Sequence, residues 1–388
     1  FCSDSLKGRG YIEQGVNKAA HCLANAFAKR KIKPLGNSYF QEFSFPINTH
    51  PGIISCRVDG EKKNVGIDFL VDPATDSVHT KCKLLQFNMR DSLDRFLLMK
   101  KIQKGFEKDE ALVLRFYNSR KKEIVDSCKA FNHIPALCIS TEEKKLTHSV
   151  STKLQGFASV TFADSMIAHK EFIELDVENV FHPSFVSKNV MATIKGKIKD
   201  SFLVFTAHYD HLGMQGNAQF PGASDNASGV SMIYYLADYF TKHKPLYTIL
   251  FILFSGEEAG LLGSSYFTEH PTFPLQKIKQ VINIDIMGNA SEGITVVNAE
   301  QCKSLYNTLL TINTKKKYLP EIRSRGQTKN SDHYPFSEKG VPAVFIYSLG
   351  GKGYYHDVMD TADNIDLTNY ENVAHLLIDA CSNILKKQ

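Results

Sequence analysis

Five short polar motifs in the second half of the chain contain residue types that bind divalent metal ions. Nitrogen and carboxylate oxygen ligands, without sulfur, are what zinc accepts when it keeps one position open for water. A glutamate pair, Glu257 and Glu258, supplies one carboxylate beyond the ligand count, as an acid/base group requires. The pattern is typical of hydrolysis by water activated at a centre of two metal ions. The candidate ligands, in chain order, are His208, Asp225, Glu258, Asp285 and His356.

Each of these motifs also has a simpler explanation when it is taken alone. Asp225 opens a turn-forming run before a predicted helix, where an ordinary Asx turn or N-cap needs no function. A glutamate pair in the first turn of a helix suits the helix dipole, and a single histidine such as His208 is more often structural. The set taken together favours the metal centre, with Asp225 as a carboxylate that bridges two ions.

Two neighbours of His208 receive different interpretations. Asp210 lies two residues further on, so an extended backbone would project both side chains from one side of the strand. We therefore expect the Asp210 carboxylate to bind the second ring nitrogen of His208 and to fix its tautomer. We interpret His211 as a surface or loop histidine. The cluster Ser331 to Phe336 either lines the same cleft or serves to cap a short helix, and the sequence leaves both alternatives open.

The elements that must position these residues alternate between strands and helices from Ser187 onward. Such alternation predicts an α/β fold with a mainly parallel central sheet flanked by helices. The candidate ligands follow the predicted strands, and ligands in such sheets gather beyond the carboxyl ends of the strands. The predicted strands are Phe202–Thr206, Thr248–Phe254, Val281–Ile284 and Ala343–Tyr347, and the predicted helices are Ala227–Tyr239, Leu261–Thr268, Lys303–Ile312 and Tyr370–Leu385.

The chain divides into three predicted parts. Residues 1–38 form an N-terminal helical segment that joins the domain bearing the ligands, residues 187–388. Residues 39–186 contain short strand-like runs, with a helical stretch at Leu93 to Phe106, and cluster no histidines with carboxylates. We interpret this part as an inserted accessory or lid domain.

Composition excludes several classes of function. The net charge of +5 arises from basic residues spread along the chain, so we expect no nucleic-acid partner. The eight cysteines have no CxxC spacing, which excludes a zinc-finger pattern and leaves scattered thiols or one or two disulfides. The longest apolar run, Leu246 to Phe254, is too short for a transmembrane segment. The chain starts at Phe1, which suggests processing or trimming.

The motifs from Ser187 onward resemble those of the zinc aminopeptidases of peptidase family M28. The resemblance rests on His208-x-Asp, Asp225-Asn-Ala-Ser-Gly, Gly256-Glu-Glu-x-Gly, Asn283-x-Asp followed by Ile286 and Met287, and Tyr355-His. It implies two Zn2+ ions per chain. One ion would be held by His208, Asp285 and Asp225, and the other by Glu258, His356 and Asp225.

The same resemblance implies the roles of the remaining site residues and of the accessory part. Glu257 would be the general base, Asp210 the carboxylate behind His208, and Tyr355 a hydrogen-bond donor to the oxyanion. Residues 39–186 occupy the place where family members carry a protease-associated domain. The implied activity is that of a metallo-aminopeptidase that acts on peptides with a free N-terminus. Its expected location is secreted or periplasmic.

Three rival functions remain open at this level. A glutaminyl cyclase resembles this fold but works with one zinc ion. Such enzymes usually bind the substrate with tryptophans, and this chain contains no tryptophan. A carboxypeptidase of the same fold acting on acidic dipeptides would require a basic pocket, for which Arg323 and Arg325 are the only arginines in the C-terminal half. A non-catalytic binding module would have lost a ligand or Glu257, and this chain retains all of them.

Overall fold

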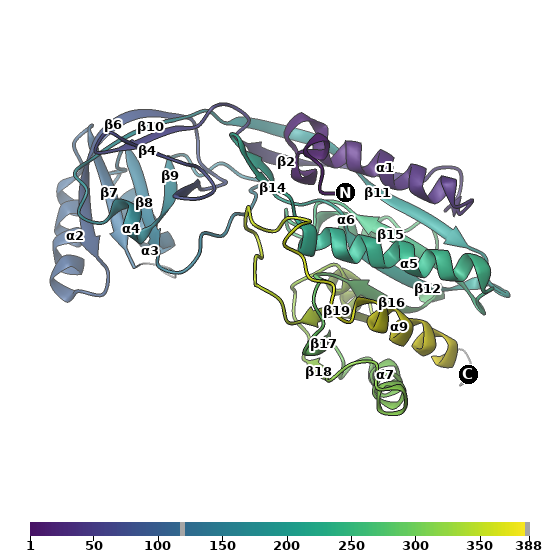
Figure 1. Ribbon diagram of the computed structural model, residues 1–388. Coiled ribbons are helices and arrows are strands. Elements are labelled where there is room, and N and C mark those ends of the chain that lie inside the picture. The colour runs from purple at the N-terminus through teal and green to yellow at the C-terminus, as the bar shows by residue number, and fades with distance from the viewer. Residues whose placement is uncertain (117–120, 385–388) are drawn as a thin grey trace.

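The computed structural model describes residues 1–116 and 121–384, and two sheets dominate it (Figure 1). The larger sheet has nine strands and the smaller sheet has eight. Leu385, the predicted end of the last helix, lies outside the described residues, as do residues 117–120 and 386–388. Within the described residues no helix has the length and apolar character that a bilayer-spanning segment needs.

The larger sheet has a parallel centre, as the alternation of strands and helices predicts. Strands β15, β12, β16 and β19 lie next to one another and run parallel. Strands β11 and β17 pair antiparallel with the outer members of this group. The predicted α/β class is therefore confirmed. The strands are β1 (Lys33–Pro34), β2 (Phe40–Thr49), β11 (Val180–Ile194), β12 (Ile198–His208), β15 (Tyr247–Phe254), β16 (Ile278–Ile284), β17 (Gly293–Val297), β18 (Ile322–Arg325) and β19 (Ala343–Leu349).

Helices cover both faces of this sheet. Since successive residues of a strand point to opposite faces, each strand contributes side chains to both of the resulting cores. In β15, Phe251 packs in the core beneath α1, α5, α7 and α9, whereas Ile252 packs in the core beneath α6 and α8. Helices α1, α5 and α9 cross one face of the sheet (Figure 1). These helices are α1 (Gly15–Lys29), α5 (Ser228–Lys242), α6 (Leu262–Glu269), α7 (Lys303–Lys316), α8 (His333–Glu338) and α9 (Tyr370–Ile384).

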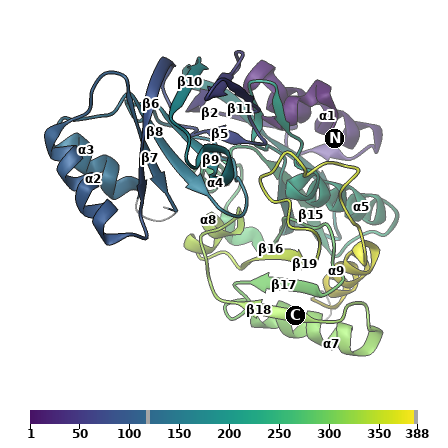
Figure 2. The same cartoon turned by 60° about the vertical axis from the view of Figure 1, so that its left-hand side comes forward.

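The smaller sheet lies beside the larger one and has its own core. Its strands are ordered β4-β3-β10-β6-β7-β8-β9-β5, and Figure 2 shows helices α2 and α3 on its outer side. The elements are β3 (Ser55–Val58), β4 (Glu61–Lys63), β5 (Phe69–Val71), β6 (Val78–Asn88), α2 (Ser92–Lys104), β7 (Glu110–Arg115), α3 (Lys121–Ala130), β8 (Leu137–Glu142), β9 (Ser159–Ala163), α4 (Asp164–Ile167) and β10 (Phe172–Val177), with a separate hairpin of β13 (Gly213–Gln215) and β14 (Ala218–Phe220).

The two long strands β2 and β11 connect the sheets. They pair with each other over most of their length, and β11 continues into its pairing with β15 in the larger sheet. Strand β2 and the first residues of β11 fall within 39–186, yet they extend the larger sheet and not the smaller one. The domain limits at residues 39 and 186 stay a prediction.

The N-terminal segment before α1 folds beneath the carboxyl edge of the larger sheet. Arg9 is fully buried there, and its guanidinium donates to the carbonyl oxygens of Tyr209 (2.8 Å), Pro221 (2.6 Å), Gly222 (2.8 Å) and Asp225 (3.4 Å). The planar fork of arginine suits several acceptors at once. One side chain near the start of the chain therefore ties together two loops that carry candidate ligands.

We predict that Arg9→Met lowers the free energy of unfolding by about 3–5 kcal/mol, because it leaves buried carbonyl groups without donors. Urea denaturation of the metal-free protein, followed by far-ultraviolet circular dichroism, measures the change. Arg57→Met is the control: Arg57 is exposed, and its hydrogen bond goes to Gly60 of its own hairpin. The control should change the stability by less than about 0.5 kcal/mol. An equal effect of both substitutions would contradict the role of Arg9.

Candidate metal centre

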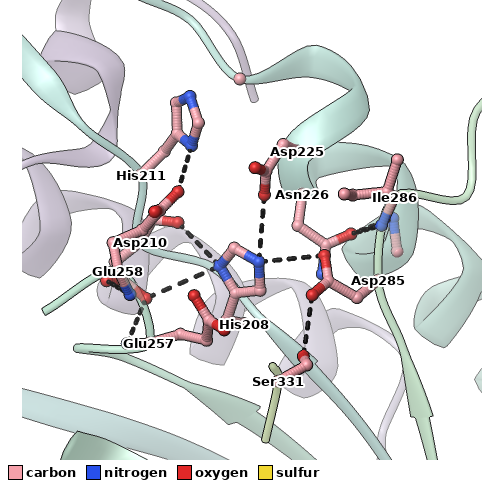
Figure 3. Close-up of polar contacts among 12 residues, drawn as sticks. His208, Asp210, His211, Asp225, Asn226, Glu257, Glu258, Asp285, Ile286 and Ser331 are labelled. Atoms are coloured by element: carbon pink, nitrogen blue, oxygen red, sulfur yellow. Dashed lines mark hydrogen bonds and ion pairs between the residues drawn. The ribbon is translucent and has the colours of Figure 1, made fainter. Parts of the chain in front are cut away.

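The five predicted ligands meet at the carboxyl edge of the larger sheet. His208 ends β12, Asp285 follows β16, Glu258 follows β15, and His356 lies in the long loop after β19. Asp225 comes from the turn Ala223–Ala227 that leads into α5. Because the central strands are parallel, their carboxyl ends lie at one edge, and Figure 3 shows the side chains of His208, Asp225, Glu258 and Asp285 gathered there.

His208 forms the centre of one group of three. Its Nε2 lies 3.1 Å from Asp225 Oδ1 and 3.1 Å from Asp285 Oδ1, and all three side chains are buried. Burial by itself lowers the pKa of His208, but the carboxylates of Asp285 and Glu257 raise it well above its ordinary value. The side chain thus sits in a strongly negative environment.

His356 forms the centre of a second group. Its Nε2 lies 3.2 Å from Asp225 Oδ2 and 3.1 Å from Glu258 Oε2. Burial lowers the pKa of His356, yet the carboxylates of Glu258 and Asp225 outweigh this effect and raise it to about 11. Asp225 is therefore shared: one of its oxygens faces each imidazole, and the two imidazoles hold its pKa well below the ordinary value despite burial.

The donor set fits a pair of cations better than it fits protons. An imidazole Nε2 carries at most one proton, but each Nε2 here faces two carboxylate oxygens at about the same distance. In each group, therefore, the imidazole nitrogen can donate to only one of the two carboxylate oxygens, and it leaves the other oxygen without that hydrogen bond. Buried charges of one sign are costly unless they are paired or bind metal. A divalent ion within each group would satisfy every atom of it.

The two neighbouring glutamates differ in their surroundings. The pKa of Glu258 falls to about 2, because the imidazoles of His356 and His211 outweigh burial and the repulsion from Asp225. Burial instead raises the pKa of Glu257 well above its ordinary value, although His208 opposes this effect. Glu257 belongs to neither of the two groups, and its carboxyl lies close enough to His208 and Glu258 to face the same space.

Asp210 makes other contacts than the predicted one. Its carboxylate lies 3.8 Å from His208 Nδ1, beyond hydrogen-bond distance, and its main-chain carbonyl takes this place at 3.1 Å. The carboxylate accepts instead from the amides of Glu257 (3.3 Å) and Glu258 (3.4 Å) and from the Tyr11 hydroxyl (3.1 Å). Burial raises the pKa of Asp210 to about 6. Asp210 therefore holds the backbone of the glutamate pair.

Tyr355 stands at the mouth of the site. Its side chain is 48% exposed, and its ring stacks on the ring of His356 with the centroids 3.7 Å apart. The oxyanion role of its hydroxyl stays a prediction.

His211 lies in the loop between β12 and β13, as one alternative of its interpretation has it, but it is not a surface histidine. Its side chain is fully buried, and Nδ1 lies 2.7 Å from Glu258 Oε1, the oxygen that does not face His356. The ring therefore fixes the orientation of the Glu258 carboxylate (Figure 3). The sequence held a signal, since His211 belongs to the same polar motif as His208 and Asp210, but exposure cannot be read from a loop.

For the cluster Ser331 to Phe336, the structure favours a position beside the cleft over the capping of a short helix. The Ser331 hydroxyl donates to Asp285 Oδ2 at 2.8 Å and accepts from the Asn283 side chain at 2.8 Å. Asp332, at the start of α8, makes no side-chain cap bond and is fully buried, which raises its pKa to about 7. Ser331 thus orients a candidate ligand.

Two further residues that the sequence did not single out hold the turn that carries Asp225. The carboxylate of Asp360 accepts from the amides of Ser224 (2.8 Å) and Asp225 (3.1 Å), while Arg9 binds the carbonyls on the other side of the turn. Both come from segments remote from Asp225 in sequence, and no local spacing indicates them.

Comparison with known proteins agrees with this geometry. The family model described as "Peptidase family M28" matches residues 189–381. A probable zinc metalloprotease of Pyricularia oryzae is 29% identical over 45% of this chain and 36% of its own length. Aminopeptidase YwaD of Bacillus subtilis is 30% identical over 52% of this chain and 46% of its own. This chain thus spans less than half the length of these relatives.

Solved structures share the fold over nearly the whole chain. The zinc aminopeptidase BSAP of Bacillus subtilis has a TM-score of 0.73 at 19% identity, covering 100% of this chain and 93% of its own. An aminopeptidase of Aneurinibacillus sp. strain AM-1 has a TM-score of 0.67 at 20% identity, covering 96% of this chain and 89% of its own. The fold is that of zinc aminopeptidases, and the chain belongs to peptidase family M28 through residues 189–381.

We predict that His211→Leu weakens the binding of one zinc ion by about 10–100-fold, because Glu258 loses the partner that orients it. Titration of the metal-free protein with zinc against a chromogenic chelator measures the affinity. His211→Asn is the matched control, since its amide nitrogen can take the place of Nδ1 and should restore most of the affinity. Unchanged zinc binding in the leucine variant would contradict this role.

Proposed function

We propose that this protein is a zinc-dependent aminopeptidase that removes N-terminal residues from peptides with the help of two metal ions. The observation that carries the proposal is the position of Asp225 between the two imidazoles, with one oxygen toward His208 and the other toward His356. A single carboxylate in this position could serve as a ligand to both ions. Membership of family M28 and the zinc aminopeptidase fold support the same function.

The chain's residues divide between the two ions. His208 and Asp285 would hold one ion together with Asp225, and Glu258 and His356 would hold the other together with Asp225. When bound, two zinc ions supply a water of lowered pKa and polarise the scissile carbonyl.

Glu257 is the proposed general base. Its carboxyl belongs to neither group of ligands, so it can take a proton from the attacking water. It then gives that proton to the leaving amine. Asp210 accepts a hydrogen bond from the main-chain amide of Glu257 and holds the backbone there. The raised pKa of Glu257 suits a group that must both accept and release a proton. The hydroxyl of Tyr355 would donate a hydrogen bond to the developing oxyanion.

A small cavity beside Asp225 supports action at the end of a peptide. Its volume is about 100 Å3, room for little more than a side chain, and Ile286, Gly351 and Tyr355 help to line it. The carboxylates at its edge would attract the free α-ammonium group of a substrate. A peptide would enter with its N-terminus against the acidic groups, which favours exopeptidase action.

The glutaminyl cyclase alternative is less well supported than the peptidase. Such an enzyme works with one zinc ion, and here both groups of three are complete, including the group of His208 and Asp285. Secretion or a periplasmic location stays a prediction that draws on the family resemblance.

Glu257→Gln should retain both zinc ions and reduce kcat by at least about 100-fold, because the amide cannot accept the proton. Release of free amino acids from a peptide library measures turnover, and elemental analysis measures the zinc content. Glu269→Gln is the matched control: Glu269 ends α6, is exposed, and should leave turnover unchanged. Near-normal turnover of Glu257→Gln would reject the assigned base.

Removal of metal tests the proposal as a whole. Dialysis against a chelator should abolish the release of amino acids, and two equivalents of zinc per chain should restore it. Full activity after complete metal removal would refute the metallopeptidase function. Binding of one zinc ion, together with cyclisation of N-terminal glutamine, would favour the cyclase alternative instead.

A further inference from the structure

The ring of His356 is held from the side that faces away from the carboxylates. Its Nδ1 donates to the carbonyl oxygen of His148 at 2.9 Å, and the amide of His148 donates to the carbonyl of His356 at 3.1 Å. His148 lies in the segment 143–151, the first part of the connection between β8 and β9 of the smaller sheet. This pair of bonds places the proton on Nδ1 and turns Nε2 toward Asp225 and Glu258.

Lys145 of the same segment contacts residues that precede and follow His356 in the loop. Its Nζ donates to the carbonyl oxygens of Gly353 (2.8 Å) and Tyr355 (2.6 Å) and lies 3.6 Å from the Asp357 carboxylate. The Lys145 side chain is 31% exposed, so the ammonium lies partly buried against the loop. One ammonium group therefore gathers three points of the loop around His356.

The loop needs such support because its own conformation is unfavourable. His356 has φ of +57°, in the left-handed region that costs a residue other than glycine about 1–2 kcal/mol. Between the end of β19 at Leu349 and the start of α9 at Tyr370, the described chain contains neither helix nor strand. A strained residue in such a loop keeps its conformation only when the surroundings determine it.

The segment 143–151 is itself firmly placed. The His148 ring is buried and stacks on Phe220 with the centroids 4.5 Å apart, and the carbonyl of Ser151 accepts from the amide of Asn48 in β2 at 2.9 Å. In Figure 1 the connection that leaves the smaller sheet reaches the yellow loop of the larger one. The contact is thus a fixed link between the two sheets.

We propose that the segment 143–151 is a positioning device for the second metal site. Lys145 and the carbonyl of His148 set the loop so that Nε2 of His356 faces the site, and neither touches the ion. The segment lies outside residues 189–381, which match the family model. This inference rests on the proposed two-zinc function, and it gives the accessory part a direct role in metal binding.

Lys145→Met tests the inference through metal affinity. The methionine keeps most of the apolar stem of the side chain but removes the ammonium, so one of the two zinc ions should bind about 10–100-fold more weakly while the other is unchanged. Stepwise zinc titration of the metal-free protein against a fluorescent chelator separates the two events. Lys145→Arg, which keeps the charge and the donors, should restore most of the lost affinity.

Lys144→Met is the matched control, because Lys144 is the exposed neighbour. It should bind both ions as the wild-type protein does. Wild-type affinity for both ions in Lys145→Met would overturn the inference, as would an equal loss for both ions, which indicates general loosening. Fewer than two zinc ions in the wild-type protein would refute the two-zinc function itself before any variant is made.

A second measurement needs no variant, and it decides the matter if Lys145→Met does not fold. If the segment favours binding of the second ion, then that ion must stabilise the segment by the same factor. Hydrogen exchange of the His148 amide, followed by mass spectrometry, should slow about 10–100-fold with one of the two equivalents of zinc, the one that fills the site of His356, and much less with the other. Exchange that responds to neither equivalent would overturn the inference.

Discussion

Buried negative charge at one edge of the larger sheet is the constraint on which the rest of this structure depends. Asp225, Glu257, Glu258 and Asp285 lie within reach of two imidazoles, and Asp210 lies directly behind them. Burial pushes some of these carboxyls toward the protonated form, as in Asp210 and Glu257, while the imidazoles keep Asp225 ionised. Such a cluster is costly without cations.

The fold meets this constraint with rigid parallel strands. The ligands follow three neighbouring strands whose side chains are buried on both faces, so their relative positions are set by the core and not by flexible loops. The exceptions are Asp225 and His356, which come from irregular segments. The segments that carry these two residues are held by contacts from outside the C-terminal half, by Arg9 for Asp225 and by His148 for His356.

The part of the chain that matches family M28 is contacted near the site by residues outside it. Arg9 and Tyr11 precede it and bind groups next to the site, and Lys145 and His148 reach the loop of His356 from the smaller sheet. The long strands β2 and β11 join both sheets and give this contact a stable frame. We infer that metal binding and the packing of the two sheets are coupled.

The sequence by itself determined the fold class and indicated which residues could form a metal centre. Buried strands produce continuous apolar runs such as Thr248–Phe254, and ligand types such as His208 and Asp285 stand directly after them. These signals are local, because strand period and turn chemistry depend on neighbouring residues. The roles of Glu257 and Tyr355 came from resemblance and stay proposals.

Only the tertiary structure decided which remote groups support the ligands. Three contacts join residues from different elements. His211 lies against Glu258, the Asp210 carboxylate accepts from the backbone of the glutamate pair, and the carbonyl of His148 accepts from the ring of His356. Strand β2, which the sequence pattern placed with the accessory part, pairs in the larger sheet instead. Long-range packing sets such pairings, and it leaves no periodic trace along the chain.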